Sequence, residues 1–291
     1  MRWPGLGRPK RLNATRRALM WWFGPPQTAH QNATVSLDAG QALAYLDGLN
    51  GGGDTKVTLN HLLAATIART LTEHPIANAR IIGWKVFQPD HVGVAMPVSL
   101  TGHAGERRGE LSMAVVPEVE TLSLRQLAQR ATRVVSGERS GKGQVPLVDV
   151  IFFLAERVPM RLVRGIFDGV SGALQHTVPA SIFWSQAPAT TALSNPGPAI
   201  GSVPGGLARG LALSLPARGL SMSTIWGVAM VQDEVRAVDG EIVVRPCLPL
   251  MLAFDHRTVD GILAGRLMAR VGEILLDPAA VFGVDGEEIP R

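Results

Sequence analysis

The sequence predicts an α+β protein in which helices are layered over a large β-sheet. Strand and helix patterns follow one another in mixed order, which disfavours the strict alternation of a doubly wound parallel sheet. The 291 residues are 46% hydrophobic and 18% charged, so the chain can bury a sizeable core. No internal repeat or low-complexity tract interrupts this pattern.

The first elements of the chain are predicted as helix, strand, helix and helix. Residues 12–23 (LNATRRALMWWF) form a short amphipathic helix, residues 33–38 a strand, 39–50 a short helix ended by three glycines, and 58–75 a helix stopped by a proline. His61 and His74 on the last of these are interpreted as helix-surface residues rather than ligands. Packing of the first helix on its own domain or a neighbouring subunit is favoured, with a membrane-surface anchor as the alternative.

The middle of the chain contains strands, a helix and an apolar segment. Residues 79–87 (ARIIGWKVF), 91–98 (HVGVAMPV) and 111–119 (LSMAVVPEV) are predicted strands, and Ser123 is the predicted cap of an amphipathic helix. Residues 145–174 are apolar but interrupted by Pro159 and Gly165, which indicates helices over the core. A re-entrant membrane segment is the alternative there, and three arginines count against it.

The last third is predicted to be mostly strands followed by a closing helix. Residues 190–197 (TTALSNPG) and 224–256 are strand segments, with a hairpin turn at Asp239-Gly240 and a buried strand at 248–254 (LPLMLAF). Apolar residues at helical spacing after Gly261 predict a helix that stops before Asp277-Pro278.

Composition excludes several classes of protein. Cys247 is the only cysteine, so an intramolecular disulfide and a cysteine-rich metal site are excluded, and we expect a cytoplasmic location. The apolar run 18–23 is too short for a secretory signal, and no run is long enough to span a membrane. The chain begins with a basic segment that could face phosphates, acidic lipids or an acidic partner, although no nucleic-acid partner is expected.

The stretch LAFDHRTVDG (252–261) places ionisable residues directly behind a buried strand. A histidine there has its backbone fixed by the sheet, and its near-neutral pKa suits a general base. Asp260 can orient the loop or bind a cation, and Gly261 is interpreted as allowing a tight passage into the helix. Spacing alone leaves open a second interpretation, in which Asp255, His256, Arg257 and Asp260 form a buried ion cluster.

The continuous stretch from Trp226 to Gly261 and on to LLDPAAV (275–281) resembles the catalytic domain of the dihydrolipoyl acyltransferases of 2-oxoacid dehydrogenase complexes, relatives of chloramphenicol acetyltransferase. Weaker similarity covers residues 16–23, 57–81, 120–134 and 192–197. The resemblance implies the chloramphenicol acetyltransferase-like two-layer fold, a large mixed sheet covered by helices. It also implies a mobile basic tail at 1–11 and one catalytic domain at 12–291, with 145–187 as an apparent helical insertion.

The resemblance implies a role for each site residue. His256 matches the base that deprotonates a thiol for attack on a thioester, and Ser194 matches the donor to the tetrahedral oxyanion. A turn role is the alternative for Ser194. Asp260 matches a structural acid held by an arginine. The remaining motif residues are Asp255, Arg257, Gly261, Asn195 and Gly197. The resemblance implies coenzyme A as a cosubstrate, and it implies no metal ion.

Several features depart from the family. Trp21-Trp22 stand where Lys-Arg is usual, so the arginine expected beside Asp260 is missing, and Arg16 or Arg257 are the substitutes to consider. Pro196 replaces a usual leucine, and the spacing from Ser194 to His256 is long. No lipoyl or subunit-binding domain precedes this region, so we expect lipoyl groups to arrive on another polypeptide.

The resemblance also implies a homotrimer or a multiple of trimers, with His256 from one chain meeting Ser194 from the next. Two other functions stay open at this point. One is a non-catalytic scaffold that keeps the fold and its oligomer contacts. The other is a small-molecule, antibiotic-type O-acetyltransferase.

Overall fold

The computed structural model describes residues 29–52, 55–100, 102–103, 111–141, 188–197 and 221–289, with a few isolated positions between 165 and 215. The predicted tail at 1–11, the first helix at 12–23 and most of the predicted insertion at 145–187 lie outside these residues. So do Arg16 and Trp21-Trp22.

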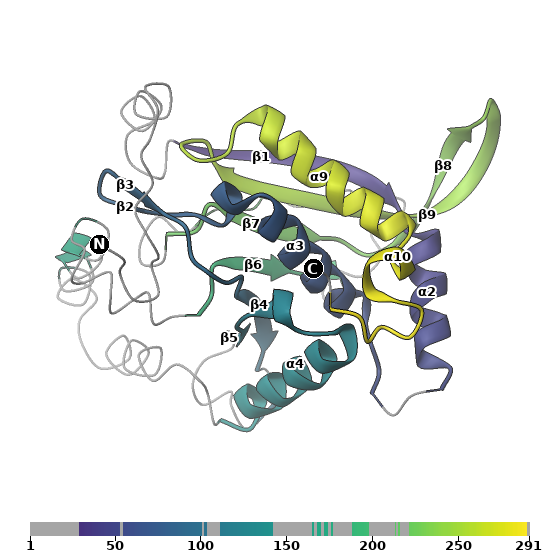
Figure 1. Cartoon of the computed structure of the whole chain (residues 1–291), viewed down its shortest axis with the longest axis horizontal. Coiled ribbons are helices and arrows are strands. Elements are labelled where there is room, and N and C mark those ends of the chain that lie inside the picture. Colours follow the sequence, from purple (N-terminus) through teal and green to yellow (C-terminus); the bar gives the residue numbers. More distant parts are fainter. Residues whose placement is uncertain are drawn as a thin grey trace.

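One seven-stranded mixed sheet forms the centre of the molecule (Figure 1). Its strands, in spatial order, are β1 (His30–Asp38), β9 (Glu241–Asp255), β7 (Thr224–Val228), β6 (Thr191–Ser194), β4 (Val94–Ser99) and β5 (Leu111–Val116), with β8 (Gln232–Val238) paired to β9. β6 runs parallel to both of its neighbours, and the other pairs are antiparallel. The predicted large mixed sheet is therefore confirmed.

The helices cover one face of this sheet. They are α2 (Gly40–Asn50), α3 (Leu59–Glu73), α4 (Leu124–Arg139), α9 (Gly261–Leu276) and the short α10 (Ala279–Phe282). Figure 1 shows α3 and α9 in front of the strands, with α4 near β5 at the bottom of the view. Alternate residues of β9, from Leu248 to Phe254, pack with Trp226 against the helices in the main core. Smaller residues such as Ala192 and Ala253 occupy the opposite face. No helix in the described ranges has the length and apolar character to cross a membrane.

Two of the helices begin with the same reciprocal cap. At α3, Thr58 accepts from the backbone N–H of His61, whose Nδ1 accepts from the N–H of Thr58. At α4, Ser123 and Gln126 make the same exchange, as the sequence predicted for Ser123. The interpretation of His61 as a helix-surface residue holds in part, because the ring belongs to the cap and is half-buried there, and burial lowers its pKa.

Residues 79–87 form a hairpin rather than the single predicted strand. β2 (Arg80–Ile82) turns at Gly83, whose φ is 59°, and pairs antiparallel with β3 (Lys85–Phe87) as a separate two-stranded sheet. The positive φ suits glycine, and the turn exposes Trp84. Gly83 inside the apolar run 79–87 is the sequence signal that could have predicted this turn.

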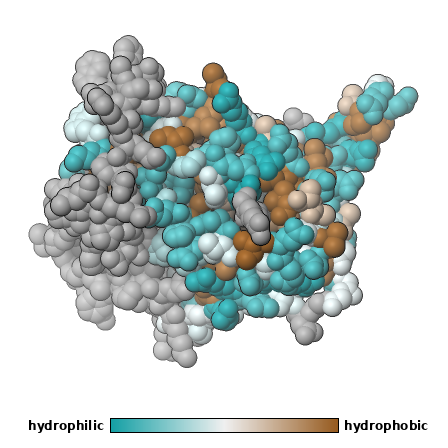
Figure 2. Space-filling view, viewed as in Figure 1, coloured by the Kyte–Doolittle hydropathy of each residue, from teal (hydrophilic) through white to brown (hydrophobic). Residues whose placement is uncertain are grey.

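The second hairpin, formed by β8 and the first half of β9, projects from the body (Figure 1). Its predicted turn is confirmed, with Asp239 at φ 52° and Gly240 at φ 86°. Along one face Val235 pairs with Val244 and Ala237 with Ile242. Val235, Val244 and Ile242 are 71%, 63% and 80% exposed, and Figure 2 shows hydrophobic residues among the hydrophilic ones on the arm. The arm therefore carries an apolar ladder in water.

Candidate active site

His256 lies in a turn directly after β9. Asp255 is the last strand residue and pairs with His30 at the start of β1, while the His256 N–H donates to the Ala29 carbonyl at 2.8 Å. The half-buried imidazole lies beside Phe254, with 6.0 Å between ring centroids. The sheet thus fixes the backbone on both sides of the histidine, as the sequence predicted.

A buried ion pair closes this turn around the histidine. The Arg257 guanidinium donates to both Asp255 carboxylate oxygens, at 2.9 and 2.6 Å, and the Arg257 backbone N–H donates to the same carboxylate at 3.0 Å. The two residues are only 7% and 3% exposed. Asp255 and Arg257, two of the four residues in the ion-cluster interpretation, therefore form a buried ion pair. Arg257, which was considered as a partner of Asp260, pairs with Asp255 instead.

Buried hydroxyls anchor the far side of the turn. Thr258 Oγ1 donates to Ser223 Oγ at 2.8 Å, and Ser223 Oγ donates to the Ala79 carbonyl at 2.7 Å. Both side chains are 1% exposed. Buried polar groups that are fully hydrogen-bonded make a turn rigid. Sequence reasoning missed Ser223, because nothing local links it to a motif more than thirty residues away.

A second histidine stands beside this ion pair. His30 lies opposite Asp255 in the register of β1 and β9. Burial lowers the pKa of His30, the Asp255 carboxylate opposes that shift, and the Arg257 guanidinium adds to it. Sequence reasoning did not single out His30, since the strand pairing that places it there is tertiary.

Asp260 starts the closing helix. Its Oδ1 accepts from the Leu263 N–H at 2.9 Å, which makes it the N-cap of α9. Gly261 lacks a positive φ, and a Cβ on it would meet none of the described atoms within 4 Å. The interpretation of Gly261 as a residue needed for a tight passage is therefore wrong for the described part of the chain.

Ser194 ends strand β6 at another place in the sheet. It pairs with Gly227 of β7, which in turn pairs with Met251 of β9. Because side chains alternate and Leu193 belongs to the core beneath the helices, Ser194 belongs to the opposite face. The hydroxyl is half-buried.

The segment after Ser194 is held by a distant helix. Asn195 Nδ2 donates to Asn60 Oδ1, in the first turn of α3, at 2.7 Å, and Asn195 Oδ1 accepts from the Gly197 N–H at 3.1 Å. A Cβ on Gly197 would lie 2.7 Å from the Met230 backbone nitrogen, so only glycine fits there. Sequence reasoning had named Asn195 and Gly197 but missed Asn60.

The approach to β6 is equally close-packed. The Arg80 guanidinium donates to the Ala189 carbonyl. Burial lowers the pKa of Arg80 to about 10, but this value is still well above neutral pH, so the guanidinium stays charged. The Gly93 N–H donates to Thr190 Oγ1, and a Cβ on Gly93 would collide with the Pro188 carbonyl. Backbone packing therefore sets where β6 begins.

Within one chain the two candidate catalytic residues lie at opposite ends of the strands. In the register of the sheet, Ser194 of β6 is level with Gly227 of β7 and Met251 of β9. Met251 precedes His256 by five residues, and β9 is two strands away from β6. At about 3.3 Å per residue and 4.8 Å per strand, the separation is roughly 16 Å along the strands and about 10 Å across them. A single copy therefore cannot bring Ser194 and His256 to one reacting atom.

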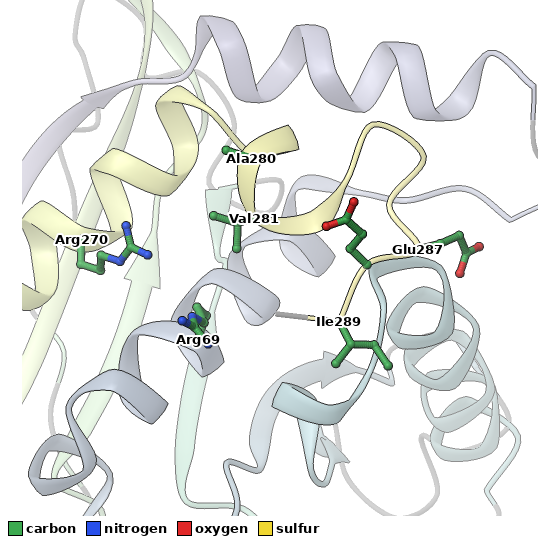
Figure 3. Close-up of a pocket in the computed structure, with 7 residues that line it drawn as sticks. Arg69, Arg270, Ala280, Val281, Glu287 and Ile289 are labelled. Carbon is green, nitrogen blue, oxygen red and sulfur yellow. The ribbon is translucent and has the colours of Figure 1, made fainter. Parts of the chain in front are cut away.

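A pocket of about 870 Å³ opens elsewhere, between the helices and the C-terminal segment. Arg69 of α3, Arg270 of α9 and Ile289 line it, and Figure 3 shows the Glu287 side chain pointing away from the two arginines. Arg270 is nine residues into α9, roughly 14 Å along the helix from its start near the His256 turn. No group of three or more His, Cys, Asp or Glu side chains in the described ranges is arranged to hold a metal ion.

Solved structures share this fold at low sequence identity. The dihydrolipoamide acetyltransferase of Azotobacter vinelandii matches with a TM-score of 0.59 and 22% identity over 94% of each chain. Chloramphenicol acetyltransferase matches with a TM-score of 0.53 and 12% identity, covering 92% of this chain and all of the other. The predicted chloramphenicol acetyltransferase-like fold is confirmed.

Sequence comparison identifies the family. A dihydrolipoyllysine-residue succinyltransferase component of the 2-oxoglutarate dehydrogenase complex from Bartonella vinsonii subsp. berkhoffii is 39% identical over 69 residues, which are 24% of this chain and 17% of that protein. The profile of the 2-oxoacid dehydrogenases acyltransferase (catalytic domain) family matches residues 25–146 and 220–283, more than half of the chain. His256 and Asp260 lie inside the matched residues, and Ser194 lies between the two matched ranges. The chain belongs to the 2-oxoacid dehydrogenases acyltransferase (catalytic domain) family.

Proposed function

We propose that this protein transfers an acyl group between coenzyme A and a thiol acceptor, with His256 as general base and Ser194 as oxyanion donor. The observation that carries the proposal is the fixed position of His256 in a rigid turn at the end of β9. A general base whose backbone is fixed in this way loses little conformational entropy when it accepts a proton from the substrate.

His256 and Ser194 account for the proton transfers and for the stabilisation of charge in the proposed reaction. His256 takes the proton of the attacking thiol, and the thiolate adds to the thioester carbonyl. Ser194 donates a hydrogen bond to the oxyanion of the tetrahedral intermediate. Collapse of that intermediate expels the second thiolate, which recovers the proton from the imidazolium.

The Azotobacter vinelandii enzyme supports this assignment. Work on its catalytic mechanism addresses one serine, one histidine and one asparagine four positions after the histidine. His256 and Asp260 have the same spacing. The names of the curated relatives support a dihydrolipoyl thiol as the acceptor.

The separation of Ser194 from His256 supports a site shared by two copies, within the predicted homotrimer or multiple of trimers. The exposed ladder of Val235, Val244 and Ile242 supports the same proposal, since association would remove this apolar surface from water. One of the structural relatives is the cubic core of a pyruvate dehydrogenase complex, which is consistent with assembly.

The direct test is coenzyme A release from acetyl-coenzyme A with dihydrolipoamide and with a panel of small hydroxyl acceptors. We expect release with the thiol, and a roughly 10²- to 10⁴-fold lower turnover in His256→Ala. Release with hydroxyl acceptors alone would indicate a small-molecule O-acetyltransferase. Absence of both release and coenzyme A binding would indicate the scaffold.

Mixed oligomers test whether the site is shared. His256→Ala and Ser194→Ala, refolded together, should regain activity that neither variant has alone. If one chain supplies the histidine and its neighbour the serine, about a quarter of the sites in an equal mixture are intact. Activity in the mixture no higher than in the two separate variants would refute sharing.

A further inference from the structure

We infer that Asn60, in the first turn of α3, is a positioning residue for the Ser194 segment. This inference rests on the proposed function, because it concerns the placement of the proposed oxyanion donor. Asn60 would not touch the substrate and would act through Asn195 and the backbone that follows Ser194.

The hydrogen bonds fix the orientation of both amides. Asn195 Oδ1 accepts from the Gly197 N–H at 3.1 Å, so the Nδ2 of Asn195 points to the other side. This Nδ2 can only donate, and at 2.7 Å it faces Asn60, which must therefore present its Oδ1. Asn60, Asn195 and Gly197 thus form one chain of hydrogen bonds in a single direction.

Both ends of this chain are anchored. Asn60 lies in the capped first turn of α3, two residues before the buried Leu62 and Leu63. At the other end, Gly197 is pressed against the Met230 backbone, with no room for a Cβ. Loss of the Asn60 contact would therefore release the segment on one side only.

Strand pairing alone holds Ser194 weakly. β6 has four residues, and Ser194 is the last of them. Because strand ends fray, the hydroxyl needs support beyond the ladder. Asn60 supplies it from a helix rooted in the main core, which couples the serine to the most buried part of the molecule.

Two substitutions at Asn60 separate positioning from folding. Asn60→Leu removes the acceptor but favours the helix, since leucine is a better helix former than asparagine. Asn60→Asp keeps an acceptor oxygen for Asn195. Thr58→Ala is the matched control, because it weakens the cap of the same helix and leaves the Asn60 contact in place.

With acetyl-coenzyme A and dihydrolipoamide, we expect Asn60→Leu to lower kcat by about 10- to 100-fold, with the KM for the donor nearly unchanged. Asn60→Asp should keep kcat within about threefold. Thr58→Ala should lower the thermal midpoint by a few degrees and leave kcat nearly intact. Wild-type kcat in Asn60→Leu, or an equal loss in Asn60→Asp, would overturn the inference.

Hydrogen exchange of the peptide spanning 191–197 gives a readout that needs no activity. Exchange at Gly197 should accelerate in Asn60→Leu and stay slow in Asn60→Asp and Thr58→Ala. If the wild type shows no turnover, the proposed function fails, and this exchange still decides the role of Asn60. Unchanged exchange in Asn60→Leu would show that Asn60 does not hold the segment.

Discussion

The turn that carries His256 and the segment that carries Ser194 are stabilised in different ways. The histidine turn is closed by its own sequence neighbours, Asp255 and Arg257, in a buried ion pair. The serine segment depends on Asn60, which lies 135 residues away in the chain. The histidine turn has a charged pair within three residues in addition to its contacts with Ala29 and Ser223, whereas the side-chain contact of the serine segment with a distant helix is a neutral amide pair.

This difference sets how each region responds to mutation. A buried charge that loses its partner is costly, so damage to the histidine turn should appear as lost stability. A neutral contact at a strand end contributes about 1 kcal/mol, so damage to the serine segment should appear mainly in turnover.

Asp255→Ala should destabilise the protein by about 3–5 kcal/mol, because it leaves the Arg257 guanidinium buried without its carboxylate. Urea unfolding measures the change. The matched control is the double variant Asp255→Ala with Arg257→Met, which removes both charges and should recover much of the loss. A single variant that loses less than about 1 kcal/mol would contradict the buried pair as the main support of the turn.

Ser194→Ala should lower turnover by about 10²- to 10³-fold, or about 3–4 kcal/mol in the barrier. The donor KM and the thermal midpoint should change little, since the contact is made chiefly in the transition state. Ser140→Ala, at the exposed end of α4, is the control. A fall in midpoint without a fall in turnover would make Ser194 a turn residue.

Asp260→Ala should cost about 1 kcal/mol, the usual value of an N-cap, and lower the thermal midpoint. Asp260→Asn should keep the midpoint, because asparagine caps helices as well as aspartate does. This expectation comes from the cap, which the sequence did not reveal. A similar fall in both variants would show that the charge, rather than the cap, is what matters.

His61→Gln should flatten the dependence of stability on pH. Burial lowers the pKa of His61 below its ordinary 6.5, so the unfolded chain takes up a proton first. Stability is thus present above about pH 6.5 and falls as the pH drops through that value toward the lower folded pKa. Glutamine keeps the capping box, as Gln126 does in α4, without titrating. Thermal midpoints between roughly pH 7 and 5.5 measure this, and an unchanged slope would exclude His61 as a contributor.

Features with a local signal could be predicted from the sequence. The helices α3, α4 and α9 follow from apolar spacing and caps, the Asp239-Gly240 turn from its residue types, and the placement of His256 from the buried strand before it. His30, Asn60 and Ser223 could not be predicted, because strand register and helix packing bring them to the site. The hairpin at Gly83 was missed because its two strands have only three residues each.

The distance between Ser194 and His256 has a consequence for catalysis in dilute solution. If each site needs two copies, the number of sites depends on mass action as well as on the amount of protein. Turnover per chain should then fall on dilution below the dissociation constant of the assembly and recover on concentration. An assay over a wide range of enzyme concentrations would reveal this, and a constant turnover per chain down to the monomeric state would exclude it. Such an enzyme would have an activity governed by its own abundance.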